Sequence, residues 1–308
     1  MRFGRRTLAG IAVAALALGS AAACGSSDPA DGGISVVAGF YPLQFVAQRV
    51  GGEGVRAVNL TQPGAEPHDL ELSPSQVGQL SDADLAVYLH GFQPAVDEAI
   101  AQAGVAALDA ATLVPLIDVS AGHGPDDGER HANEEGGIDP HIWLDPTRLA
   151  TIADAVAGRL AELDPDGATG YRERAAALRA ELTALDGEFA DGLRDCERRE
   201  IVVSHAAFGY LADRYDLHQI PITGLSPETE PTPGQLADAA EEAREVGATT
   251  IFFETLVSPA VAEAVADAVG AETAVLDPIE GLGPGENGDY LSVMRANLAT
   301  LRPALGCA

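Results

Sequence analysis

From residue 34 onwards, short apolar runs of strand length alternate with amphipathic stretches of helical period. Such alternation favours α/β architecture, with parallel sheets joined by right-handed crossovers. The predicted strands are 34–38, 55–60, 85–89 and 116–119 in the first half, and 200–204, 219–223, 249–253 and 273–276 in the second. The predicted helices between them are 42–50, 74–81, 94–103, 206–215, 232–246 and 260–269.

The segment 166–194 separates the two sets of strands and has a different pattern. It contains no proline, and its apolar positions recur at helical spacing, which predicts a rod of about 40 Å. A second helix over 146–163 precedes it, with Asp145 as cap and Pro146 at the first helical position. The apolar positions of the rod are Tyr171, Ala175, Leu178, Leu182, Leu185 and Phe189.

These patterns predict two α/β lobes, each with a parallel four-stranded sheet flanked by helices, joined by a long rigid backbone helix. We expect the N-terminal lobe at 34–145, linking helices at 146–197 and the C-terminal lobe at 198–308. Residues 120–138 lack periodicity and read as a mobile loop rich in His and acids. Its His123 and His131 either collect metal loosely or are incidental to a solvated linker.

Residues 1–23 have the pattern of an export signal: arginines, then an apolar stretch, then small residues. Cys24 follows directly and reads as a lipidated cysteine, with 24–33 as a tether; ordinary cleavage leaving a free Cys24 is the alternative. The sequence does not settle the export route. Because no later segment reaches the roughly 20 apolar residues of a membrane span, we expect membrane attachment through the lipid only.

The chain has 18 basic and 47 acidic residues, a net charge of −29, and the basic residues are all arginine. Loss of the leader removes three arginines and no acid, so the mature protein is still more acidic. This charge excludes nucleic-acid binding through phosphate neutralisation and favours the attraction of cations. The two remaining cysteines, Cys196 and Cys307, favour a disulfide in an exported chain over a metal site, because neither has a second ligand at short spacing.

Three histidines stand in loop or strand-end contexts that suggest ligands. His68 follows Pro-Gly-Ala-Glu-Pro, His141 lies in Asp-Pro-His-Ile-Trp-Leu-Asp-Pro, and His205 directly follows an apolar strand. Asp277 follows the last predicted strand and is the candidate fourth ligand. Because ligands bind beyond the carboxyl ends of parallel strands, the four can converge between the lobes. Three imidazoles and one carboxylate suit Zn²⁺.

Each candidate also has a plainer interpretation. His68 can be a surface loop residue, His141 a buried hydrogen-bonded imidazole, His205 a helix cap and Asp277 a turn former. His90, another strand-end histidine, competes with them. Nearby carboxylates can orient imidazoles, and Glu280 or a water can replace Asp277 as fourth ligand. Those carboxylates are Glu66, Asp69, Glu254 and Glu280.

Five motifs occur in order across residues 34–305, and together they resemble the zinc and manganese solute-binding lipoproteins of bacterial ABC importers. They are 40–42 (Phe-Tyr-Pro), 63–68 (Pro-Gly-Ala-Glu-Pro-His), 139–146 (Asp-Pro-His-Ile-Trp-Leu-Asp-Pro), 203–211 (Val-Ser-His-Ala-Ala-Phe-Gly-Tyr-Leu) and 276–278 (Leu-Asp-Pro). The resemblance implies metal bound between two similar lobes. It carries the ligand role to His68, His141, His205 and Asp277.

The same resemblance implies a protein held at the outer face of the cytoplasmic membrane by its lipid, in the cell envelope or periplasm. It implies a monomer that delivers its metal to an ABC permease with a separate ATPase subunit, with a metallochaperone as a further partner class. Manganese-type members commonly have a carboxylate where His205 stands, so Zn²⁺ is favoured over Mn²⁺. A zinc-dependent hydrolase is the rival from another class, but a fourth protein ligand would close the site to catalytic water. A surface adhesin would share only the lipid anchor.

Overall fold

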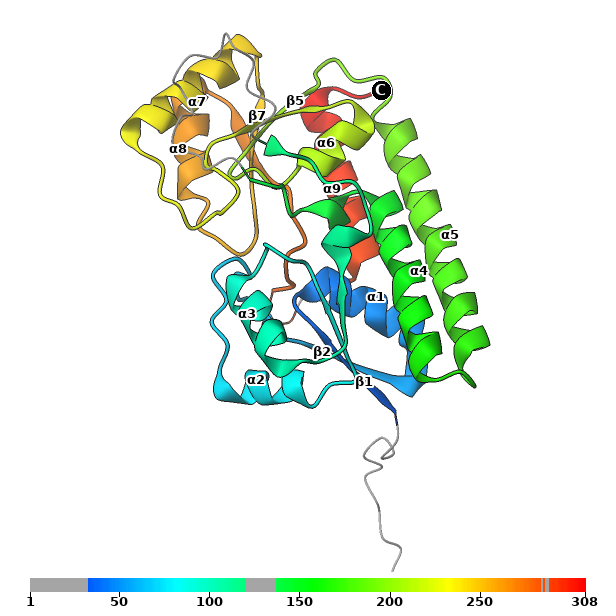
Figure 1. The fold of residues 1–308 in the computed structure, drawn as a ribbon. Coiled ribbons are helices and arrows are strands. Elements are labelled where there is room, and N and C mark those ends of the chain that lie inside the picture. Colours follow the sequence, from blue (N-terminus) through cyan, green and yellow to red (C-terminus); the bar gives the residue numbers. More distant parts are fainter. Residues whose placement is uncertain (1–32, 120–136, 284, 286–287) are drawn as a thin grey trace, which may run out of the picture. The chain divides into compact units, whose positions relative to one another are not determined.

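Two parallel sheets with the same strand order organise the protein (Figure 1). The computed structural model describes residues 33–119, 137–283, 285 and 288–308, so the export signal, Cys24, His123 and His131 lie outside the described residues. The first sheet has the order β2-β1-β3-β4 and the second the order β6-β5-β7-β8. The strands are β1 (Ile34–Ala38), β2 (Val55–Asn59), β3 (Leu85–Tyr88), β4 (Ala107–Asp109), β5 (Glu200–Val203), β6 (His218–Pro221), β7 (Thr250–Phe253) and β8 (Glu272–Val275).

Helices flank both sheets, which confirms the predicted two-lobed α/β architecture. The first lobe has α1 (Tyr41–Gly51), α2 (Pro74–Ser81) and α3 (Pro94–Ala103), with the 3₁₀ turns η1 (Gly52–Gly54) and η2 (Ala110–Thr112). The second lobe has α6 (Gly209–Tyr215), α7 (Pro233–Glu245) and α8 (Ala260–Val269). The remaining elements are η4 (Ile142–Leu144), α4 (Pro146–Leu163), α5 (Ala168–Gly192) and α9 (Tyr290–Leu305).

Helices α4 and α5 join the lobes. The 25 residues of α5 span about 37 Å at 1.5 Å per residue. Its buried stripe is the one expected from the sequence, from Tyr171 to Phe189. Helix α5 packs on α4, α1 and α9, and a single apolar core cluster continues from the first sheet through these helices to the second. The lobes are therefore held on one packed support.

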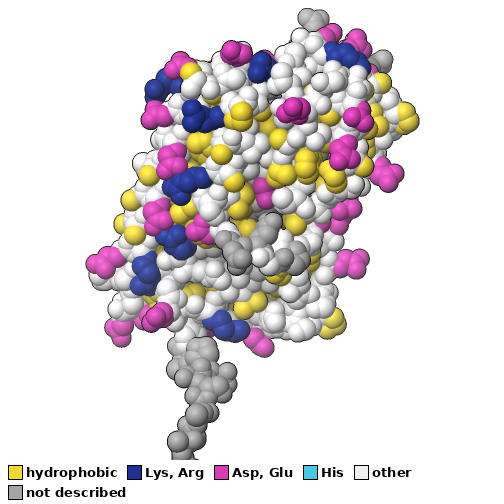
Figure 2. Space-filling model, turned by 180° about the vertical axis from the view of Figure 1, so that it is seen from behind, with side chains coloured by type: hydrophobic (Ala, Val, Ile, Leu, Met, Phe, Trp, Pro, Cys, Tyr) yellow, Lys and Arg dark blue, Asp and Glu magenta, His cyan; other side chains and the backbone are white. Residues whose placement is uncertain are grey.

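Ion pairs add orientation to this packing. Figure 2 shows arginine and acidic side chains interleaved along one edge of the molecule. Four pairs of the described residues tie α5 to other helices, namely Arg49–Glu181, Arg179–Asp154, Arg214–Asp186 and Arg295–Glu188. Exposed pairs of this kind contribute little free energy each, so the apolar stripe supplies most of the stability.

The structure differs from the sequence prediction at the fourth strand of the first sheet. That strand is β4, Ala107–Asp109, and the predicted strand 116–119 is wrong. This segment instead bonds to the residues just before His141: Val119 N–H donates to the Gly137 carbonyl (3.0 Å), and Asp139 N–H to the Ile117 carbonyl (2.9 Å). Helix α9 is a second difference, since the hydrophobic pattern predicts no helix there.

The structure joins Cys196 to Cys307 as a disulfide across 111 residues of sequence. Cys196 lies just after α5 and Cys307 just after α9, so the bond links two helices that also pack together. Among the described residues, no helix has both the length and the apolar character needed to cross a membrane.

Candidate metal centre

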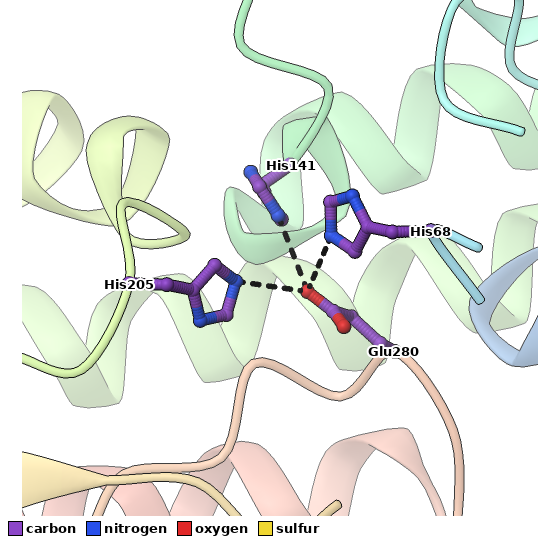
Figure 3. Close-up of side chains that lie close together, drawn as sticks. All are labelled: His68, His141, His205 and Glu280. Carbon is purple, nitrogen blue, oxygen red and sulfur yellow. Dashed lines mark hydrogen bonds and ion pairs between the residues drawn. The ribbon is translucent and has the colours of Figure 1, made fainter. Parts of the chain in front are cut away.

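Four side chains from four separate segments meet between the two sheets (Figure 3). His68 lies in the loop between β2 and α2, and His141 immediately precedes η4. His205 lies in the loop after β5, and Glu280 in the loop after β8. Three of the four thus lie beyond the carboxyl ends of parallel strands, where open α/β sheets bind ligands.

The donor atoms of these residues converge on one point. The Glu280 Oε1 atom lies 3.3 Å from Nε2 of His68 and 3.2 Å from Nε2 of both His141 and His205. All four donor atoms lie within 4.8 Å of one another. Three imidazole nitrogens and a carboxylate oxygen at these separations have the composition of a closed four-ligand zinc site.

Carboxylates behind two of the rings fix which nitrogen faces the centre. The Nδ1 atom of His141 lies 2.8 Å from Asp139 Oδ1, and the Nδ1 atom of His205 lies 2.8 Å from Glu254 Oε1. A carboxylate can only accept, so each Nδ1 carries the proton and donates it. The Nε2 lone pairs of the neutral rings are then free for a metal, as in other carboxylate–histidine–metal arrangements.

The centre is almost wholly removed from water. His141 and Glu280 are buried, and the His68 side chain is 10% exposed. Phe92 lies edge-on to His68 with ring centroids 4.6 Å apart, and Trp143 lies 5.2 Å from His141. This apolar wall lowers the local dielectric and strengthens every charge interaction inside it.

Three buried carboxylate oxygens at the centre have no hydrogen-bond partner among the described residues: Glu66 Oε2, Glu254 Oε2 and Glu280 Oε2. Leaving such atoms unpaired is costly, and the unpaired oxygen of Glu280, one of the four converging residues, fits a site that holds a cation. Glu66 also accepts from the His68 backbone N–H at 3.0 Å, which ties that carboxylate to the first histidine loop.

The ring pKa values show that protons can take the place of a cation. Burial opposes the charged form of His205, but the hydrogen bonds to Glu254 and Glu280 outweigh it and raise its pKa to about 10. Burial likewise opposes charge on His141, and Asp139 and Glu280 raise its pKa above the usual 6.5. His68 is the opposite case, because burial lowers its pKa despite the contact with Glu280.

The pKa values of the two carboxyl groups Glu280 and Glu66 also shift in opposite directions. Burial opposes the charge on Glu280, yet bonds to the three histidines hold its pKa well below 4.5. Burial and repulsion from Glu280 raise the pKa of Glu66 to about 9. The metal-free centre therefore pairs an ionised Glu280 with a protonated His205, and Glu66 stays neutral at physiological pH.

Comparison with known proteins places the chain. Residues 36–304 match the family described as zinc-uptake complex component A, periplasmic (ZnuA). The chain belongs to this family. Within it, the high-affinity zinc uptake system protein ZnuA of Bacillus subtilis is 32% identical over 298 residues, which cover 94% of this chain and 93% of that protein.

The zinc-binding lipoprotein AdcA of Streptococcus pneumoniae serotype 4 is 33% identical over 292 residues, which cover 91% of this chain and 57% of AdcA. The chain thus spans little more than half the length of that relative. A solved structure, the Zn(II)-bound ZnuA-like domain of Streptococcus pneumoniae AdcA, superposes with a TM-score of 0.75 at 30% identity. That match covers 89% of this chain and 99% of the domain.

The structure departs from the sequence expectation at the fourth position. Asp277 is not in the group, and Glu280 lies there instead. The reason is local: the Asp277 carboxylate accepts from Ile279 N–H in its own loop (2.7 Å) and from the Thr255 hydroxyl in the loop after β7 (3.1 Å). The sequence signal for Glu280 was a carboxylate three residues downstream in the same strand-end loop.

The other histidines of the described chain lie elsewhere. His90 is 68% exposed and pairs with Asp97 at 3.3 Å, and His218 is exposed at the start of β6. Asp69 is not in the group either. Glu254 bonds the His205 ring, as expected of a nearby carboxylate, whereas Glu66 bonds the backbone N–H of His68.

Proposed function

We propose that this protein captures Zn²⁺ outside the cytoplasm and delivers it to an ABC importer, and that it is not an enzyme. The observation that carries the proposal is the convergence of three Nε2 atoms and Glu280 Oε1 within 4.8 Å. The metal ligands are His68, His141, His205 and Glu280. Family membership and the zinc-named relatives support the cargo and the role.

The donor set favours Zn²⁺ over Mn²⁺. Zinc accepts imidazole and carboxylate in tetrahedral sites, whereas manganese prefers a harder, oxygen-rich set. Asp139 and Glu254 hold the rings of His141 and His205 in the tautomer that presents Nε2, so little rearrangement accompanies binding. A site closed by Glu280 leaves no position for a catalytic water, which speaks against the hydrolase alternative.

The N-terminal sequence and the relatives support a place for the protein outside the cytoplasmic membrane. Residues 1–23 are an export signal, and Cys24 carries a lipid that anchors the protein outside the cytoplasmic membrane; the relative AdcA is named a lipoprotein. In that oxidising setting Cys196 and Cys307 remain bonded. Residues 24–33 are the tether, and His123 and His131 are an auxiliary metal-collecting pair.

The partners are a membrane permease and a separate ATPase subunit. The protein works as a monomer, and a metallochaperone is a further donor or acceptor of the metal. Loss of zinc-dependent growth and of ⁶⁵Zn uptake on deletion of the gene tests this part of the proposal. Normal uptake without the protein would contradict it.

The site itself is tested by zinc titration of the chelator-stripped protein against a competing chelator. We expect one tight zinc per chain, and loss of tight binding in His205→Ala and Glu280→Ala. The matched control is His90→Ala, a histidine at the end of β3 whose side chain is 68% exposed. Unchanged affinity in His205→Ala would refute the site, and preference for Mn²⁺ in competition would refute the metal.

A further inference from the structure

Asp277 is a buried acid of the centre whose role the ligand set leaves unexplained. It is 7% exposed, close in sequence to Glu280, and not among the four converging residues. Its Oδ1 atom accepts from the backbone N–H of Ile279 at 2.7 Å, two residues further on. This is an aspartate turn, in which the side chain takes the place of a backbone carbonyl. Its Oδ2 atom accepts from the Thr255 hydroxyl at 3.1 Å.

Ile279 has an unusual backbone conformation. Its φ is +58°, and among the described residues only Asp216 shares a positive φ without being glycine. A β-branched side chain is disfavoured in this left-handed region, so other contacts must hold the residue there. The Ile279 side chain is fully buried in the core cluster. The side chain anchors the residue from one side, and the Asp277 carboxylate anchors its N–H from the other.

The chain leading into Ile279 is fixed at several points. Asn297 of α9 accepts from Asp277 N–H (2.9 Å) and donates to the Asp277 carbonyl (2.6 Å). The Trp143 indole N–H donates to the Pro278 carbonyl at 2.7 Å, and Trp143 is two residues from His141. The backbone of Asp277 and Pro278 is therefore held against both α9 and the segment that carries His141.

Because the backbone of Asp277 and Pro278 is fixed, the dihedral angle φ of Ile279 determines the direction of Glu280. A change of φ from +58° to an ordinary value near −60° is a rotation of about 120° about the Ile279 N–Cα bond. Such a rotation redirects the following residue, and the 3.2–3.3 Å approach of Glu280 Oε1 to the three rings would be lost. In the structure, the carboxylate of Glu280 reaches the centre from this left-handed turn.

We propose that Asp277 is the positioning residue for Glu280: its carboxylate holds the left-handed turn at Ile279 that directs Glu280 to the metal. The inference rests on the proposed function, in which Glu280 is the fourth ligand. Asp277 touches no metal in this account and acts through another residue. It does so because the turn needs an acceptor for the Ile279 N–H at this place.

The test is a double-mutant cycle on the full-length protein, read as the zinc dissociation constant against a competing chelator. Asp277→Ala removes the acceptor and should weaken zinc about 10- to 100-fold, the usual range for residues that orient ligands. Asp277→Asn retains an acceptor oxygen for Ile279 N–H and should bind nearly as tightly as wild type. In the Glu280→Ala background, Asp277→Ala should cause no further loss, because the residue it positions is gone.

A second readout separates positioning from folding. The visible absorption of the Co²⁺-substituted protein depends on the number and type of ligands, so Asp277→Ala should shift it towards the spectrum of Glu280→Ala. If Asp277→Ala does not fold, Asp277→Ser supplies a shorter acceptor and should show a smaller shift in the same direction.

The outcomes are distinguishable. Additive losses from Asp277→Ala and Glu280→Ala would overturn the inference, since Asp277 would then act independently of Glu280. An unchanged zinc affinity and Co²⁺ spectrum in Asp277→Ala, with only a lower melting temperature, would overturn it too. If His205→Ala still binds zinc tightly, the proposed site itself fails, and the Asp277 account fails with it for that separate reason.

Discussion

Zinc binding to this centre should expel a proton, because the His205 imidazole is protonated in the metal-free site. Burial opposes the charge on His205, but Glu254 and Glu280 outweigh it and raise its pKa to about 10, and the pKa of His141 is also raised. Imidazole must be neutral to bind a metal, so the proton on His205 leaves as zinc enters. The apparent zinc affinity must then rise with pH up to the raised pKa values and fall as pH decreases.

The magnitude follows from the pKa of His205, about 10. At about pH 7.5 this lies roughly 2.5 units above the solution pH, which corresponds to about 3 kcal/mol or some 300-fold in apparent affinity. Between about pH 7 and pH 9 the logarithm of the association constant should rise by about one per pH unit, for the one proton released from His205.

Isothermal titration calorimetry in two buffers of different ionisation enthalpy measures the proton count directly. Glu254→Gln removes the charge that supports the His205 imidazolium, so the count should fall by about one. Glu181→Gln is the control, since Glu181 is a half-exposed residue of α5 that pairs with Arg49. Equal enthalpies in both buffers, or a proton count unaffected by Glu254→Gln, would refute the reasoning.

Two further predictions concern the support of the site. Replacing Cys196 and Cys307 by serine opens a loop of 111 residues and should lower the free energy of unfolding by about 4–5 kcal/mol. Denaturant titration measures this free energy, and an unfolding midpoint equal to that of the wild type would contradict the prediction. The variant should still bind one zinc per chain. In Gly209→Ala the new Cβ would lie 2.3 Å from Asp139 Oδ2, so Asp139 must leave His141 and zinc should bind about 10-fold more weakly. Gly158→Ala, where a Cβ meets no neighbour within 4 Å, is the matched control for chelator competition, and equal affinities in the two variants would contradict the account.

Much of the fold could be predicted because burial leaves a plain pattern. The stripe from Tyr171 to Phe189 recurs at helical spacing, so the long helix was predicted with its buried face. The prediction of the fourth strand of the first sheet was wrong because burial leaves no such pattern there. β4 is three half-buried residues, Ala107–Asp109, with little apolar signal, whereas 116–119 is more apolar but pairs with the segment before His141.

The histidines of the centre could be predicted because strand ends bring side chains to one edge of a sheet whatever the loop conformation. The fourth side chain could not be predicted in this way. Whether Asp277 or Glu280 faces the rings depends on a positive φ at Ile279, a residue type that rarely adopts one. Sequence patterns report average preferences, and this turn is an exception held by tertiary contacts.

The linking helices α4 and α5 divide the four proposed ligands into two pairs along the chain. His68 and His141 precede the linking helices, and His205 and Glu280 follow them. Each half of the chain thus supplies a bidentate pair of ligands. The α4–α5 support fixes the distance between the two pairs and so sets the effective concentration of one pair for the other. In the proposed function, bound zinc joins the two halves of the chain, and separating them would remove two of the four donors at once.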